Sequence, residues 1–306
     1  MPEVRSEQFR AMGSDIHLIA VNGDAESLEW ARARVDELEA RWSRFRPDSD
    51  VSRLNAAHGV PTEVSADTVL LLQQAVEAWS ISGGSFDPTL LDALRAAGYD
   101  RTFDELAGQG ELVLPALRFD RPDVHDIEID GLQVRFPDGL GFDPGGIGKG
   151  LAADLLVHGL LERGVGGACA NMGGDLRVAG TSPDGASWTI AIDHPARDEP
   201  LALVGLAAGA VATSTVLKRQ WTVGGQPRHH LIDPATGRPA ESDVALATVI
   251  AGTAWQAEVL AKAALLRGRE RAFDLLDDTM AGLVVDHEGH VTTSDTFTRF
   301  TTLPRT

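Results

Sequence analysis

The segment DPGGIGKGLAADLL, residues 143–156, places an aspartate and four glycines directly before a run of helix-forming apolar residues. Glycines that open a helix let backbone N–H groups approach an anion, and the helix dipole favours negative charge there. Lys149 adds a cation suited to phosphate. A P-loop, however, would need glycine at Asp143 and serine or threonine at Gly150, and the glycine spacing also differs from the dinucleotide-binding pattern. The segment therefore predicts either an anion cradle or only a tight turn that begins a helix.

Composition limits the classes of function. The chain has 306 residues, of which 43% are hydrophobic and 24% charged, as in ordinary globular proteins. Its formal net charge of −18 argues against nucleic acid or an anionic membrane as the main partner. The longest apolar run, from Leu201, is too short to span a bilayer, and the N-terminus has no secretory pattern, so we expect a cytoplasmic protein. The single cysteine, Cys169, excludes an intramolecular disulfide and is predicted to be a core residue.

Hydrophobic periodicity predicts a mixture of helices and strands. Helices are expected over residues 25–45, 65–82 (with Ser65 as N-cap), 89–98, 147–163, 253–268 and 270–277. Strands are expected over residues 14–23, 167–171, 175–179, 188–193, 201–206, 209–214, 229–232 and 244–250, and hairpins around Gly131 and in residues 281–294. Residues 46–55 are interpreted as a turn, and residues 100–125 as irregular. The mixed order and the absence of a linker predict one domain over residues 1–306, α+β or α/β with an antiparallel sheet.

Several short polar segments along the chain have simple structural explanations when taken singly. DPATG, residues 233–237, fits a proline-initiated turn, and Glu258 and Lys262 have the spacing of a surface ion pair on a helix. Taken together and in order, they are far more specific. The set comprises MG (12–13), SRFRPDSDVSRLN (43–55), FDPT (86–89), DPGGIGKGLAAD (143–154), NMGGD (171–175), ATS (212–214) and HLIDPATGRP (230–239). This ordered set resembles the ApbE family of FAD:protein FMN transferases.

The resemblance implies a single α/β domain of T-fold-like architecture that binds FAD in an extended groove. Such proteins cleave the pyrophosphate of FAD, release AMP and attach FMN through a phosphoester to a threonine of an acceptor protein. A divalent metal, usually magnesium, assists them. The family's acceptors carry a short target motif that this chain lacks, so we expect a separate acceptor protein.

The resemblance also implies the cofactor-binding residues. They are Met12, Phe45, Ser85, Phe86, Asp87, Asp143, Lys149, Leu231 and Ile232. Phe45 stands where the family often has tyrosine; ring stacking would survive this change, but a hydroxyl contact would not. For Phe86, core packing is the alternative interpretation. Asn55, Asn171 and Asp175 stand in the motifs as well, but they could equally form Asx turns.

His230 is the catalytic residue that the resemblance implies, as the base that takes the proton from the acceptor threonine. A threonine hydroxyl is a poor nucleophile at neutral pH, and the pKa range of histidine suits a general base. If residues 229–232 form a strand, the neighbouring His229 points to the opposite face.

The implied metal ligands are the backbone carbonyl of Gly146 and the side chains at positions 258 and 262. Glu258 replaces an aspartate and keeps a hard oxygen ligand. Lys262 replaces a threonine, and an ammonium group is not a ligand and repels a cation. The sequence therefore predicts a weaker dependence on magnesium than in relatives with threonine. Thr215, where the family prefers glycine, is a further departure.

Two other functions stay open at this point. Water could attack in place of threonine, which would make the protein an FAD pyrophosphatase that forms FMN and AMP. Alternatively, the chain could bind FAD without catalysis, with Lys262 permanently replacing the charge of the metal.

Overall fold

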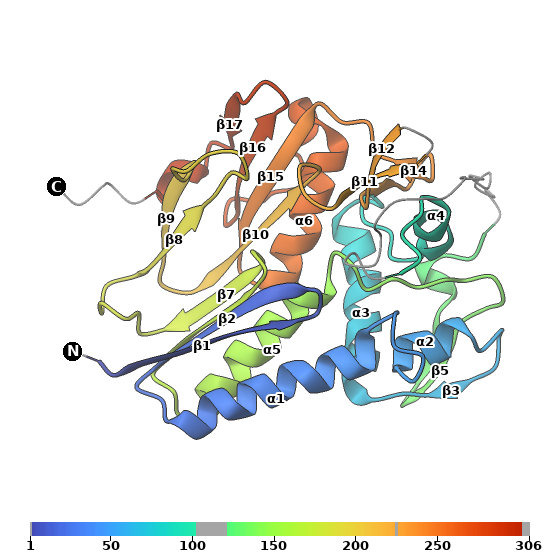
Figure 1. The fold of residues 1–306 in the computed structure, drawn as a ribbon, viewed down its shortest axis with the longest axis horizontal. Helices are drawn as coiled ribbons and strands as arrows, with labels where there is room; N and C mark the ends of the chain where they lie inside the picture. Colours follow the sequence, from blue (N-terminus) through green and yellow to red (C-terminus); the bar gives the residue numbers. More distant parts are fainter. Residues whose placement is uncertain (1, 102–120, 224–225, 302–306) are drawn as a thin grey trace. The chain divides into compact units, whose positions relative to one another are not determined.

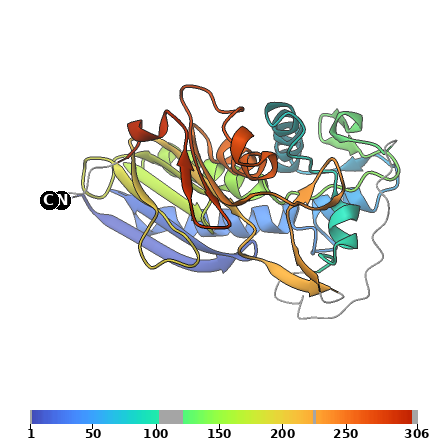
Figure 2. The same cartoon turned by 90° about the horizontal axis from the view of Figure 1, so that it is seen from above.

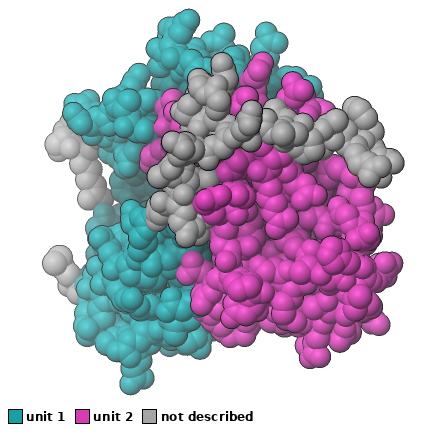
Figure 3. All heavy atoms as spheres, turned by 45° about the vertical axis from the view of Figure 1, so that its right-hand side comes forward, with its two compact units in different colours: residues 1–36, 149–215, 242–306 teal, residues 37–148, 216–241 magenta. Residues whose placement is uncertain are grey.

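The computed structural model describes residues 2–101, 121–223 and 226–301. The chain divides into two compact units, which are coloured separately in Figure 3. Unit 1 comprises residues 1–36, 149–215 and 242–306, and unit 2 comprises residues 37–148 and 216–241. Helix α1 (Ala25–Trp42) begins in unit 1 and ends in unit 2. No helix among the described residues has the length and apolar character needed to cross a membrane.

Unit 1 is built on one eight-stranded sheet with the order β1-β2-β6-β7-β10-β15-β16-β17 (Figure 1). Every neighbouring pair in this sheet is antiparallel. The strands are β1 (Val4–Ala11), β2 (Ser14–Val21), β6 (Gly167–Met172), β7 (Leu176–Gly180), β10 (Gly209–Thr215), β15 (Val244–Ala251), β16 (Ala281–Asp286) and β17 (Val291–Thr293). The predicted α/β class with an antiparallel sheet is thereby confirmed.

Both faces of this sheet are covered, and all eight residues of β15 are buried. On one face, the hairpin β8 (Trp188–Ile192) and β9 (Ala202–Leu206) joins a single apolar cluster with side chains from β2, β6, β7, β10, β15 and β16. On the other face, α6 (Ala254–Arg267) packs against β10 and β15. Helix α5 (Gly148–Glu162) lies beside α6. Figure 2 shows the helices and strands from above.

Helices α5 and α6 meet at Gly150, where a side chain would not fit. A Cβ atom at this position would lie 2.4 Å from the carbonyl oxygen of Ala254. The Asp154 carboxylate on α5 accepts hydrogen bonds from the N–H groups of Ala254 (2.9 Å) and Trp255 (3.0 Å), the first residues of α6. In return, Glu258 on α6 accepts a hydrogen bond from the N–H group of Gly150 near the start of α5 (2.8 Å). Each helix thus supplies the carboxylate that caps the other's N-terminus.

Apart from α3, the helices and strands of unit 2 are short. Its helices are α2 (Asp50–Asn55), α3 (Ala66–Ile81) and α4 (Leu91–Ala96). Its strands are β3 (Thr62–Glu63), β4 (Glu128–Asp130), β5 (Gln133–Arg135), β11 (Gln220–Val223), β12 (Gln226–His229), β13 (Ile232–Asp233) and β14 (Arg238–Pro239). They form the three-stranded sheet β3-β5-β4 and the hairpins β11-β12 and β13-β14. Single 3-10 turns occur at Val124–Asp126 in this unit and at Arg269–Arg271 and Phe297–Arg299 in unit 1.

Most predicted elements are confirmed within a few residues at each end, including the Ser65 N-cap, whose hydroxyl accepts from the Thr68 N–H. Cys169 is buried, and its burial raises the pKa of the thiol to about 12. Most of the stretch predicted to be irregular, residues 102–120, lies outside the described residues.

Three local predictions were wrong. Residues 46–55 contain helix α2, because Ser49 provides an N-cap for it. Residues 229–232 are not one strand, since β12 ends at His229 and β13 begins at Ile232. The helix predicted over residues 270–277 is absent, and a 3-10 turn at Arg269–Arg271 leads into further turns there.

The capping of α6 by Asp154 predicts a specific dependence of stability on pH. Burial raises the pKa of Asp154 from its ordinary 3.8 to about 6, against the opposing effect of its hydrogen bonds. The folded protein therefore binds this proton more tightly than the unfolded chain. As pH rises from about 4 to 6, wild type should lose up to about 3 kcal/mol of unfolding free energy relative to Asp154→Asn, which cannot titrate.

Urea denaturation of both proteins at pH 4 and pH 7 measures this difference. Asp198→Asn, at an exposed loop position, is the matched control and should follow wild type at both pH values. If the gap between wild type and Asp154→Asn were the same at both pH values, the raised pKa would be contradicted.

Candidate functional site

The predicted site residues fall into two groups, one in each unit. Unit 1 carries Met12, Lys149, Glu258 and Lys262, and unit 2 carries Phe45, Ser85, Phe86, Asp87, Asp143, Gly146, His230, Leu231 and Ile232.

In unit 1, Lys149 is held by two buried carboxylates. Its Nζ atom forms an ion pair with the carboxylate of Asp175 and lies 3.5 Å from Oε1 of Glu258. The side chains of Asp175 and Glu258 are only 4% and 5% exposed. We call these three residues the Lys149 centre. Asp175 is thus a direct partner of the lysine, which the alternative sequence interpretation of this residue as a turn former does not include.

Several backbone N–H groups of the glycine-rich segment donate hydrogen bonds to other groups of the protein. The N–H groups of Ile147 and Gly148 both donate to the carbonyl oxygen of Pro144, at 3.3 and 2.9 Å, and Gly150 donates to Glu258. The segment is thus a tight turn that begins a helix, as one of the two sequence interpretations held. Anion binding by this segment stays a prediction, and Lys149 is its one cationic candidate.

Met12 lies at the tip of the β1–β2 hairpin in a conformation that its residue type rarely adopts. Met12 and Gly13 form the two-residue turn, with φ of +49° and +63°. Such turns favour Asn, Asp or Gly, and a bulky residue with positive φ is strained. Strain of this kind is often retained at functional sites. By contrast, Asn171 simply forms a turn, since its side-chain oxygen accepts from the Gly174 N–H at 2.7 Å.

In unit 2, Arg44 organises the surroundings of Asp143. Its Nε atom lies 2.9 Å from Oδ1 of Asp143, and its Nη2 atom donates to the carbonyl oxygen of Tyr99 at 2.9 Å. The guanidinium carbon lies 4.1 Å from the ring centre of Phe45 and 4.6 Å from that of Tyr99. The Arg44 side chain is 4% exposed, whereas Phe45 is 37% exposed. Sequence reasoning missed Arg44, although it adjoins Phe45 in the SRFRP motif.

Asn55 fixes the backbone directly before Asp143. Its side-chain amide donates to the carbonyl oxygen of Phe142 at 2.9 Å and accepts from the Phe142 N–H at 2.8 Å. Asn55 therefore forms no local Asx turn but ties two motifs that lie far apart in sequence. Three residues beyond Asp143, Gly146 has φ of +100°, which favours glycine.

Several predicted cofactor-binding side chains of unit 2 belong to its core or to internal turns. Phe86 is completely buried, as the core-packing alternative requires. The Asp87 carboxylate accepts from the N–H and hydroxyl groups of Thr89 at 2.8 and 2.5 Å and forms an ion pair with Arg121. Ser85, the first residue of this trio, is half-buried.

Leu231 and Ile232 are also buried, at 4% and 2% exposure. Ile232 packs in an apolar cluster with Leu90, Ala97 and Trp221. The apolar side chains of this pair, like that of Phe86, thus serve the core of unit 2.

The two neighbouring histidines differ in what their rings can do. Nε2 of His229 lies 3.1 Å from the carbonyl oxygen of Ala240, and Nδ1 accepts a hydrogen bond from the Leu231 N–H at 3.3 Å. Because a carbonyl oxygen only accepts, Nε2 must carry the proton, and Nδ1 faces a backbone donor. Both nitrogens of His229 are therefore committed to the fold. His230 is half-buried with a buried Nδ1 atom.

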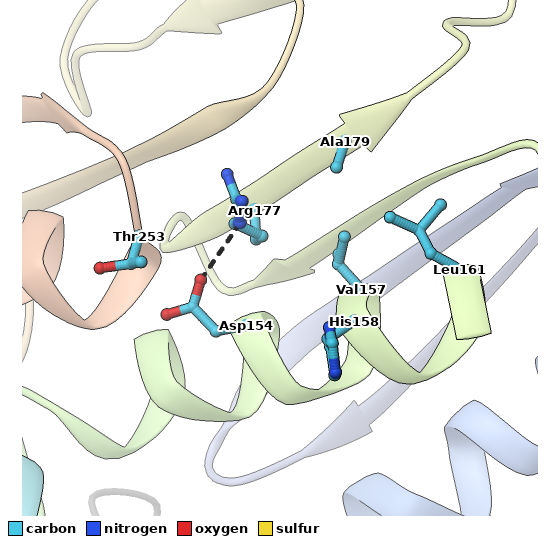
Figure 4. A pocket seen from close by; sticks show the side chains of 7 residues that line it. All are labelled: Asp154, Val157, His158, Leu161, Arg177, Ala179 and Thr253. Carbon is cyan, nitrogen blue, oxygen red and sulfur yellow. Dashed lines mark ion pairs between the residues drawn. The ribbon is translucent and has the colours of Figure 1, made fainter.

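A separate cavity of about 230 Å³ lies in unit 1 and is shown in Figure 4. Its lining residues come from α5, β7 and the start of α6; they are Asp154, Val157, His158, Leu161, Arg177, Ala179 and Thr253. Asp154 and Arg177 form an ion pair at its edge, with 3.3 Å between Oδ1 and Nε. None of the predicted site residues lines this cavity.

Comparison with known proteins gives one consistent result. The profile of the ApbE family matches residues 12–285. The FAD:protein FMN transferase of Vibrio cholerae serotype O1 is 28% identical over 256 residues, which cover 81% of this chain and 75% of that protein. The FAD:protein FMN transferase of Treponema pallidum is 28% identical over 270 residues, covering 82% and 74%.

Solved structures agree with these relatives. The apo form of the Pseudomonas stutzeri flavinyl transferase ApbE matches with a TM-score of 0.82 at 26% identity, covering 98% of this chain and 97% of that one. The ApbE protein of Thermotoga maritima matches with a TM-score of 0.85 at 25% identity, covering 98% and 100%.

The burial of Arg44 predicts that its removal destabilises the protein. Arg44→Met keeps the length of the side chain but leaves the Asp143 carboxylate without its buried partner. The free energy of unfolding should fall by about 3 kcal/mol. Arg46→Met, at an exposed position two residues away, should change it by less than about 0.5 kcal/mol. Urea denaturation of the three proteins gives both values, and equal stabilities for the two variants would contradict the assigned role of Arg44.

Proposed function

The chain belongs to the ApbE family, and from this premise we propose that it is an FAD:protein FMN transferase. The observation that carries the proposal is the match to the family over residues 12–285, which spans parts of both units. The two relatives compared above, which bear this name, are each 28% identical to this chain. We take the two units as one functional domain, because a single family profile covers both.

The reaction transfers FMN from FAD to a hydroxyl group. The oxygen of an acceptor threonine attacks the phosphorus that bears the riboflavin, the P–O bond to the adenosine phosphate breaks, and AMP leaves. The hydroxyl proton passes to a base. We propose that the acceptor is a separate protein and that the reaction takes place in the cytoplasm.

In unit 2, we assign the binding of FAD to Asp143 and the exposed ring of Phe45. Arg44 supports both, because it is paired with the Asp143 carboxylate and stacked on the Phe45 ring. A planar cation below the ring leaves the opposite side of Phe45 for stacking with an aromatic ligand. Ser85, Phe86, Asp87, Leu231 and Ile232 then act by shaping the surrounding backbone.

In unit 1, Lys149 supplies positive charge for the pyrophosphate. Its partners Asp175 and Glu258 hold the ammonium in place, so that little side-chain freedom is lost when a phosphate binds. Met12, in its strained turn, is assigned a contact with FAD.

His230 is the proposed base. His229 is unsuited to this role, because accepting a proton would put an N–H group of its ring against the Leu231 N–H. In His230 the Nδ1 atom is buried, so we propose that Nε2 takes the proton from the threonine hydroxyl.

The residues at the expected magnesium positions do not fit a divalent cation. One oxygen of Glu258 accepts from Gly150 and the other faces the Lys149 ammonium, while Lys262 offers no ligand atom. No step above is therefore assigned to a metal, and Gly146 is given no ligand role.

Purified protein, incubated with FAD and an acceptor protein that carries a target threonine, tests the function. Covalent flavin fluorescence on the acceptor, with one AMP released per flavin, is expected. Free FMN and AMP without labelled acceptor would instead favour the pyrophosphatase, and unchanged FAD would favour a binding protein.

The proposed role of Lys149 predicts how FAD and FMN are discriminated. FMN lacks the second phosphate and the adenosine, so wild type should bind FAD more tightly. Lys149→Met should weaken FAD binding by about 10- to 100-fold, as expected for a lost charge-assisted contact, and should affect FMN less. Lys218→Met, at an exposed position, is the control. Titration calorimetry measures all affinities, and an equal loss for FAD and FMN would overturn the assignment.

The two histidines predict opposite results on mutation. His230→Ala should retain FAD binding but lose about 10²- to 10⁴-fold in the rate of transfer. His229→Ala should keep the transfer rate of its folded fraction and lower the melting temperature, because two internal hydrogen bonds are lost. Single-turnover transfer rates and thermal melts of both variants test this assignment. Loss of transfer in His229→Ala but not in His230→Ala would assign the base to His229.

A further inference from the structure

Three carboxylates and three cations of unit 1, from α5, α6, β7 and the residue directly before β7, carry the inference. The carboxylates are Asp154, Asp175 and Glu258, and the cations are Lys149, Arg177 and Lys262. Asp154 is paired with Arg177. Lys149 serves both Asp175 and Glu258, so the Lys149 centre by itself carries a net charge of −1.

A pyrophosphate would not be attracted to a buried centre of net negative charge. One further cation is needed before the Lys149 centre can accept it. Lys262 is placed to supply this charge, since it follows Glu258 by four residues on α6 and therefore lies on the same face of that helix. It is half-buried in a helix most of whose residues are buried.

A divalent cation would meet three obstacles at this place. It would need oxygen ligands, and the oxygens of Glu258 and Asp175 already face Gly150 and Lys149. It would also add two positive charges beside two lysines. Displacing Glu258 would moreover uncap α5, because its carboxylate receives the Gly150 N–H.

We propose that Lys262 is the second cation of this site, that it replaces a divalent metal, and that FAD cleavage by this chain is independent of magnesium. The inference rests on the proposed function for its catalytic part. Its metal-binding part can be tested without any turnover.

The metal-binding test compares wild type, Lys262→Thr and Lys262→Met by thermal melting and calorimetry with Mg²⁺ and Mn²⁺. Neither ion should bind or shift the melting temperature of wild type. Lys262→Thr removes the charge and adds a hydroxyl ligand, so it should gain metal-dependent stabilisation. Lys262→Met removes the charge without adding a ligand and should gain less. Lys218→Thr is the matched control and should behave as wild type. A shift in wild type as large as that in Lys262→Thr would overturn the proposal.

The turnover test uses FAD with EDTA or magnesium and follows the release of AMP. The wild-type rate should change by less than about twofold between the two conditions. The rate of Lys262→Thr should be at least about tenfold higher with magnesium than with EDTA. Lys262→Met should be slow in both. A wild-type rate that EDTA abolishes and magnesium restores would overturn the proposal. If no protein cleaved FAD in any condition, the proposed function would fail, and the metal-binding result would still decide the nature of the cation.

Discussion

The close crossing of α5 and α6 at Gly150 is the constraint on which the rest of unit 1 depends. Two backbones can approach this closely only because Gly150 has no Cβ atom. At that distance, Asp154 reaches the first amides of α6 and Glu258 reaches an amide at the start of α5. The two helices thereby fix each other's position, and α6 packs on the central strands β10 and β15. The position of Lys149 follows, because Glu258 is one of its two carboxylate partners.

The two units position a cationic side chain in the same way. In each, a cationic side chain is held by carboxylates that are largely removed from water: Lys149 by Asp175 and Glu258, and Arg44 by Asp143. Buried ion pairs add little net stability, because desolvation offsets most of the attraction, but they define geometry closely. Arg44 shows the difference between the two cations, since its planar group also stacks on Phe45 and Tyr99, which an ammonium could not do as well.

Much of the fold and the family could be predicted from the sequence, because local patterns carry this information. The apolar period of α6, the alternation in β2 and the Ser65 cap are all visible in short windows. β1 escaped detection because its sequence VRSEQFRA is largely polar and exposed and has no apolar face to recognise. Arg44 and Asp175 were underrated for another reason: their importance lies in partners about 100 and 26 residues away, and no local pattern indicates such pairs. His230 was assigned by the family resemblance, and only the opposite orientation of His229 depended on a strand over residues 229–232, which the structure does not have. The two internal ring contacts of His229 distinguish the two residues instead.

The charge of the whole molecule explains why the composition of the Lys149 centre matters. With a net charge of −18, the protein repels a dianionic pyrophosphate at long range, so local cations must provide the attraction. Lys149 alone cannot, because Asp175 and Glu258 outnumber it. With Lys262 as the proposed second cation, the centre would be neutral, whereas a divalent ion in the same place would bring it to +1. A lysine therefore gives weaker attraction than a metal, but the charge is permanently present and keeps the Glu258 cap on α5 intact. In the site proposed above, a lysine at position 262 would exchange binding strength for independence from a bound ion, one helical turn beyond the Glu258 cap.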